Sequence, residues 1–184
     1  MASPSLIVVS GPPGSGKTTL AHRLAQGVGC PALCRDELKE GMVHAHPGFT
    51  PGPVDELNLR TLPAFFGAVE YLLRAGITVV AEAAYQDKLW RPGLTPLLEL
   101  AAVRLVRCQV DPDTVADRIR RRYEENGLRA AAHGDLAHLA EVRERTLTFD
   151  PITLDVPTVD VDTTDGYRPG LPELINFARE RASR

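Results

Sequence analysis

Residues 6–20 read LIVVSGPPGSGKTTL. A short apolar run leads into a glycine-rich turn over residues 11–16, and a helical pattern begins at Lys17. The turn matches the spacing G-x-x-x-x-G-K-[ST] and stands between a strand and a helix, as a phosphate-binding loop requires. Such glycines let consecutive backbone N–H groups surround phosphate oxygens, and the helix N-terminus adds positive charge. The sequence therefore predicts a nucleoside-triphosphate site, against the alternative of a glycine-rich turn with an incidental lysine.

This motif assigns roles to individual residues. We expect Lys17 to be a catalytic residue that contacts the β- and γ-phosphates, and the Thr18 hydroxyl to ligate Mg²⁺. ATP or GTP is the expected phosphate donor. The residues expected to contact the nucleotide are the loop and the start of its helix, namely Pro13, Gly14, Ser15, Gly16, Lys17, Thr18 and Thr19.

The rest of the chain alternates short apolar runs with helical patterns, which predicts an α/β fold with a parallel sheet covered by helices on both faces. Arg104 and Arg107 indicate that the fourth strand is less buried than the others, and Pro63 is expected to kink or divide the helix that contains it. Further strands are expected near 30–34, 78–81, 103–110 and 156–161, and helices from 37 and over 54–75, 112–125, 136–146 and 171–181. Residues 88–100 are expected to form a broken helix, because they contain Pro92, Gly93 and Pro96.

Composition limits the class of protein. The length of 184 residues predicts a single domain over 1–184. Twenty-one basic and 24 acidic residues give a net charge of −3, which disfavours a dedicated nucleic-acid binder. No apolar stretch is long enough to span a membrane. Three cysteines without C-x-x-C or Cys/His ligand spacing fit the reduced thiols of a cytoplasmic protein better than a disulfide framework or a zinc site.

Ligands of parallel sheets bind at the carboxyl ends of the strands, and two acidic residues follow predicted strands. Asp36 could accept the proton of an acceptor hydroxyl, or it could cap the helix that begins at Glu37. Its neighbours Arg35 and Lys39 could hold a polar or anionic substrate, or they could be solvated. Glu82 could hold Mg²⁺ or the substrate, or it could face solvent.

Four arginines crowd one helix after the fourth strand. Arg118 and Arg122 stand four positions apart and share a face. We expect Arg118 to lie against the adenine and Arg122 to approach the γ-phosphate, both catalytic, as parts of a lid over about 118–135 with hinges at Gly127 and Gly134. The alternative is a solvated basic helix paired with its own glutamates.

Two further groups are placed by position alone. The segment 163–165 follows the last predicted strand and could border the purine. Tyr85 and Trp90 could line an acceptor pocket, although packing in the core is the commoner use of such residues.

Four segments together resemble the P-loop kinases: GPPGSGKTT (11–19), CRDELKEGM (34–42), TVVAEAAY (78–85) and CQVDPDTVADRIRRR (108–122). They are most similar to small kinases related to chloramphenicol phosphotransferase and polynucleotide 5′-kinase. The resemblance implies a five-stranded parallel sheet in the order 2-3-1-4-5, a short helical lid that carries Arg118 and Arg122, and Asp36 as general base. One position departs from the polynucleotide kinases, because Lys39 stands where they carry the arginine that binds the acceptor phosphate.

The resulting hypothesis is a phosphotransferase that uses Mg²⁺ and ATP or GTP to phosphorylate a hydroxyl of a small molecule. An antibiotic, a nucleoside or a sugar-like natural product would suit, and antibiotic self-resistance is a possible specialisation on resemblance. Neither nucleic acid nor a membrane is expected as a partner. Two alternatives stay open: a nucleic-acid 5′-end kinase, and a nucleotide-hydrolysing switch without an acceptor.

Overall fold

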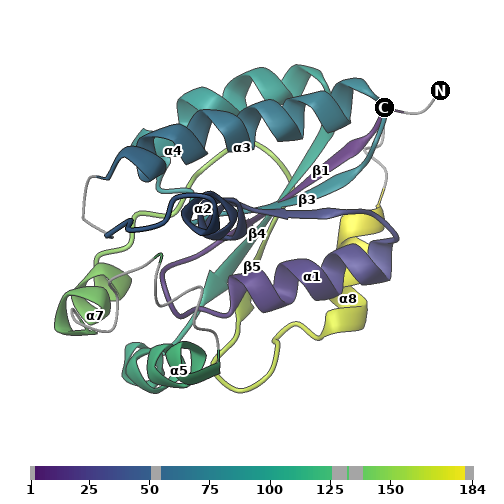
Figure 1. Ribbon diagram of the computed structural model, residues 1–184. Coiled ribbons are helices and arrows are strands. Elements are labelled where there is room, and N and C mark those ends of the chain that lie inside the picture. Colours follow the sequence, from purple (N-terminus) through teal and green to yellow (C-terminus); the bar gives the residue numbers. More distant parts are fainter. Residues whose placement is uncertain (1–2, 51–54, 126–131, 133–138, 181–184) are drawn as a thin grey trace.

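A computed structural model describes residues 3–50, 55–125, 132 and 139–180. Its centre is a sheet of five parallel strands in the order β2-β3-β1-β4-β5, as expected (Figure 1). The strands are β1 (Ser5–Ser10), β2 (Ala32–Cys34), β3 (Val79–Glu82), β4 (Ala102–Gln109) and β5 (Thr158–Asp162).

Helices cover both faces of this sheet. Helices α3 and α4 lie on one face, and α1 and α8 lie on the other (Figure 1). None of the described helices combines the length and the apolar character that a membrane span needs. The helices are α1 (Lys17–Val28), α2 (Arg35–His44), α3 (Glu56–Arg74), α4 (Asp87–Leu94), the 3₁₀ helix η1 (Thr95–Glu99), α5 (Pro112–Glu125), α7 (Leu139–Leu147) and α8 (Leu171–Arg179).

The alternation of side chains along β1 divides the core in two. Leu6 and Val8 join a cluster with Phe65 of α3, whereas Ile7 and Val9 join a cluster with α1 and α8 on the opposite face. All four strand residues are at most 1% exposed. A strand that is apolar on both faces is typical of a central position in a parallel sheet, and β1 occupies that position.

Arg104 corrects the expectation that the arginines mark a less buried β4. Its side chain is 5% exposed, and its guanidinium donates twice to the carbonyl oxygen of Glu180, at 2.7 and 3.0 Å. It also lies 5.2 Å from the ring centre of Phe177 in α8. The end of a helix offers carbonyl groups without intrahelical partners, so it can accept a buried cation. Arg107 instead pairs with Asp160 on the neighbouring strand β5, at 2.7 Å.

Several expected boundaries also differ. Helix α3 runs through Pro63 without a break. The broken helix expected over 88–100 is confirmed, because this segment is divided into α4 and η1. The N-cap of α2 is Cys34, so Asp36 lies in the first turn and does not cap the helix. Half of the predicted lid, including Gly127 and Gly134, lies outside the described residues.

Candidate nucleotide and acceptor site

The loop over residues 11–16 connects β1 to α1 at the carboxyl edge of the sheet. Gly14 and Gly16 both have φ of +75°, in the left-handed region that glycine adopts without strain. A Cβ on Gly14 would lie only 2.7 Å from Cγ1 of Val115, so α5 packs directly against the loop. Gly16 is the N-cap of α1, and the first N–H groups of a helix have no intrahelical partner. The loop therefore presents backbone donors where phosphate oxygens would bind.

Lys17, Thr18 and Glu82 meet beside this loop. The Lys17 ammonium lies 3.8 Å from one Glu82 carboxylate oxygen, and the Thr18 hydroxyl donates to the other at 3.1 Å. The parallel register that places Glu82 opposite Val9 brings β3 to the loop. Glu82 is buried, and this burial raises its pKa, while the charge of Lys17 acts in the opposite direction. The two residues expected to hold Mg²⁺, Thr18 and Glu82, are thus in direct contact.

Asp36 shares this edge of the sheet. Helix α2 begins directly after β2, which pairs with β3, and Asp36 therefore lies near Glu82, whose pKa its negative charge helps to raise. The Asp36 side chain is 24% exposed, so solvent and a substrate can reach it. Arg35 donates to Asp36 at 3.1 Å and to Asn58 of α3 at 2.7 Å. Arg35 thus orients the carboxylate relative to α3.

Lys39 fits neither role that the sequence suggested for it. It is 3% exposed, its ammonium lies 2.8 Å from a carboxylate oxygen of Asp55, and it sits over the ring of Phe49. Asp55 also caps α3 by accepting from the backbone N–H of Asn58 at 2.7 Å. Lys39 is therefore a buried link between α2 and α3. The sequence reasoning missed Asp55 and Asn58, although an aspartate before a helical pattern is a signal of an N-cap.

The arginines of α5 border a cavity of about 370 Å³ next to the loop. Arg118 ties α5 to the loop and to the segment after β5, because it donates to the carbonyl oxygens of Gly14 at 3.3 Å, Thr163 at 2.6 Å and Thr164 at 3.0 Å. Cationic and aromatic side chains beside a phosphate loop suit the base and sugar of a nucleotide. The cavity is lined by Gly16, Thr19, Arg23, Arg118, Arg121, Arg122, Glu125, Thr163, Gly166 and Tyr167.

Tyr85 and Trp90 pack in the core. Both are buried, their ring centres are 4.9 Å apart, and both rings contact Phe65. The Tyr85 hydroxyl has no hydrogen-bond partner among the described residues, and burial raises its pKa well above the usual value. Of the two roles that the sequence left open for this pair, packing is the one that the contacts support.

The structure therefore collects the predicted residues into two neighbouring groups. Lys17, Thr18, Glu82 and Asp36 lie together at the ends of β1, β2 and β3. Thr19, Arg118 and Arg122 border the cavity at the other side of the loop. Pro13, Gly14, Ser15 and Gly16 form the loop between the two groups, and the Ser15 hydroxyl is buried without a hydrogen-bond partner among the described residues.

Comparison with solved structures shows the same fold in several kinases. A protein from Chloroflexus aurantiacus J-10-fl, described as a candidate kinase, has 25% identity over 98% of this chain and all of that chain, with a TM-score of 0.84. A gluconokinase from Sinorhizobium meliloti 1021 has 20% identity over 97% of this chain and 91% of its own, with a TM-score of 0.58. The APS kinase of Mycobacterium tuberculosis, solved with AMPPNP and APS, has 15% identity over 98% of this chain and all of its own, with a TM-score of 0.61.

Sequence comparison gives no significant match among curated proteins. The family model described as an AAA domain (AAA_33) matches residues 6–147, which is more than half of the chain. The nucleotide loop, the order of the strands and the kinases that share this fold agree with that match. The chain belongs to the AAA domain family, within the P-loop kinase superfamily.

Proposed function

We propose that this protein is a kinase that transfers the γ-phosphate of ATP or GTP to a hydroxyl group of a small molecule. The observation that carries the proposal is the placement of Asp36 beside the buried group of Lys17, Thr18 and Glu82. A nucleotide-binding loop alone would serve a switch equally well. An accessible carboxylate at the same edge of the sheet supplies what a kinase needs in addition, a base for the acceptor hydroxyl.

The donor atoms at the loop fit a magnesium ion. A carboxylate oxygen of Glu82 and the hydroxyl oxygen of Thr18 are hard oxygen ligands 3.1 Å apart, which is the ligand type that Mg²⁺ prefers. Thr18 and Glu82 would hold the ion, directly or through water, and the bound ion would neutralise charge on the β- and γ-phosphates.

In the proposed reaction the loop amides and Lys17 bind and orient the triphosphate. Asp36 accepts the proton of the acceptor hydroxyl while the hydroxyl oxygen forms a bond to the γ-phosphorus and the bond to the β-phosphate oxygen breaks. Arg118 holds the loop against the segment after β5, and Arg122 borders the cavity from the same helix face. An arginine near the transferred group would stabilise the negative charge on its equatorial oxygens.

A small acceptor is favoured over a nucleic-acid end. The net charge is −3, and Lys39 is buried against Asp55, so it does not offer a free cation to an acceptor phosphate. An antibiotic, a nucleoside or a sugar-like compound would each present a suitable hydroxyl. One of the proteins with the same fold is described as a gluconokinase, which supports a polyhydroxylated acceptor.

The direct test is incubation with ATP or GTP and Mg²⁺ against a library of hydroxylated metabolites and antibiotics, with mass spectrometry to detect the gain of one phosphoryl group. In the Asp36→Asn variant, transfer should be slower by about two to four orders of magnitude, while nucleotide affinity stays the same. Asp117→Asn is a matched control, because this exposed carboxylate pairs only with its helix neighbour Arg120 among the described contacts. Nucleotide hydrolysis that no hydroxyl compound accelerates would indicate a switch and contradict the proposal.

A further inference from the structure

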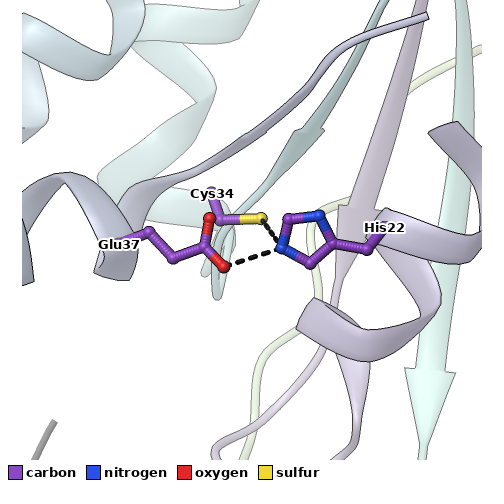
Figure 2. A group of neighbouring side chains, drawn as sticks. All are labelled: His22, Cys34 and Glu37. Carbon is purple, nitrogen blue, oxygen red and sulfur yellow. Dashed lines mark hydrogen bonds and ion pairs between the residues drawn. The ribbon is translucent and has the colours of Figure 1, made fainter. Parts of the chain in front are cut away.

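Three side chains of different chemistry converge next to the candidate site without belonging to it. They are His22 of α1, Cys34 at the end of β2 and Glu37 in the first turn of α2 (Figure 2). His22 Nε2 lies 2.7 Å from Glu37 Oε1 and 3.8 Å from Cys34 Sγ. The three donor atoms all lie within 4.8 Å of one another.

The arrangement differs from a catalytic thiol, imidazole and carboxylate. In such a triad the two ring nitrogens face different partners, the nucleophile and the acid. Here one nitrogen, Nε2 of His22, faces both the sulfur and the carboxylate (Figure 2). Three atoms of the types that ligate cations, all within 4.8 Å of one another, are close enough to share one ion.

The distances are close to those of a tetrahedral zinc site. Zn–S and Zn–N bonds of about 2.3 and 2.0–2.1 Å place the sulfur and the nitrogen about 3.6 Å apart. The observed separation between Cys34 Sγ and His22 Nε2 is 3.8 Å. The nitrogen and the Glu37 oxygen would have to separate to about 3.3 Å, which a change of the Glu37 side-chain rotamer can supply.

Access and anchoring also suit a cation site. The side chains of His22 and Glu37 are 50% and 44% exposed, so an ion can enter and a water molecule can complete the coordination. Cys34 is buried at the end of β2, opposite Glu82 of β3, so the sulfur is held by the sheet. A thiol, an imidazole and a carboxylate together favour zinc over magnesium, because magnesium prefers oxygen ligands.

We propose that His22, Cys34 and Glu37 form a binding site for a thiol-binding divalent cation of the Zn²⁺ type, with water as the fourth ligand. Its three ligands differ from those of the expected magnesium site at Thr18 and Glu82, although Cys34 borders Glu82, and the site does not depend on the proposed kinase reaction. Asp36 lies between two of the ligands in the chain. A bound cation would join α1 to the first turn of α2 and would thereby hold the backbone that carries Asp36.

The test is titration of the full chain with Co²⁺ in a buffer that contains Mg²⁺, followed by competition with Zn²⁺. We expect one equivalent to bind, with a thiolate-to-cobalt charge-transfer band and the absorption of tetrahedral cobalt, both removed by Zn²⁺. Cys34→Ser should abolish the charge-transfer band, whereas Cys30→Ser, which changes a partly buried cysteine outside the cluster, should retain it.

His22→Gln and Glu37→Gln serve as further variants, since both side chains are about half exposed and their replacement leaves the core intact. Each should weaken cobalt binding by about ten-fold or more. Zn²⁺ should also raise the thermal unfolding midpoint of the unmodified protein but not that of Cys34→Ser. The proposal is overturned if no charge-transfer band forms, if the band persists in Cys34→Ser, or if the two surface variants bind cobalt as tightly as the unmodified protein.

Discussion

Gly14 is a position in the phosphate loop where a single added methyl group has a calculable cost. Its φ of +75° costs an L-residue about 1–2 kcal/mol. The new Cβ would also lie 2.7 Å from Cγ1 of Val115, which is 1% exposed. Because valine is β-branched and has few rotamers, this contact cannot relax freely, and overpacking of this kind costs about 1–3 kcal/mol. Gly14→Ala should therefore lower the free energy of unfolding by about 2–5 kcal/mol.

Gly16→Ala is the matched control, because Gly16 has the same φ but its Cβ would approach nothing closer than Arg118 Nη1, at 3.9 Å. This variant should lose only the backbone part, about 1–2 kcal/mol. Urea unfolding followed by the fluorescence of Trp90, the one tryptophan in the chain, measures both. Equal losses in the two variants would refute the packing of the loop against Val115.

Three other predictions concern the contacts around the site and the thiols. Arg118→Ala should lower the free energy of unfolding by about 1.5–3 kcal/mol, because three carbonyl groups lose a charged donor, and urea denaturation would measure this loss. The same variant should bind nucleotide more weakly, which calorimetric titration would measure. Lys39→Met should lower the free energy of unfolding in urea by about 3 kcal/mol, because the buried charge of Asp55 loses the cation that it pairs with. A decrease of less than about 1 kcal/mol would contradict this. Alkylation should modify Cys30 first, because Cys30 is partly exposed whereas Cys34 and Cys108 are buried, and burial raises the pKa of Cys108 to about 12. Peptide mapping that finds Cys108 modified at the same rate in the folded protein would disagree.

The parts of the fold that the sequence predicts best are those with local causes. The apolar run before residue 11, the glycines and Lys17 form a continuous pattern, so the loop and its helix are visible without any knowledge of distant contacts. The positions of Asp36 and Glu82 follow from one rule, that the carboxyl ends of parallel strands share an edge. The order of the strands is not a local property, and it came from the resemblance to P-loop kinases.

The expectations that were wrong or incomplete depend on contacts between distant segments. Arg104 is buried because a helix end 76 residues later accepts its hydrogen bonds. Lys39 is a buried link because Asp55, the N-cap of another helix, lies opposite it. The sequence also gives no sign that β2 and α1 bring His22 and Cys34 together from 12 positions apart. No hydrophobic period or motif spacing encodes such pairs.

The parallel sheet also separates the described ends of the chain from the nucleotide. Ser5 begins β1 opposite Ala102, and the carbonyl oxygen of Glu180 meets Arg104 near the start of β4, so both ends lie at the amino edge of the sheet (Figure 1). The six residues of β1 place the phosphate loop about 20 Å away. A fluorescent label attached near Ser5 or Glu180 would therefore leave the edge that carries the phosphate loop open to ligands.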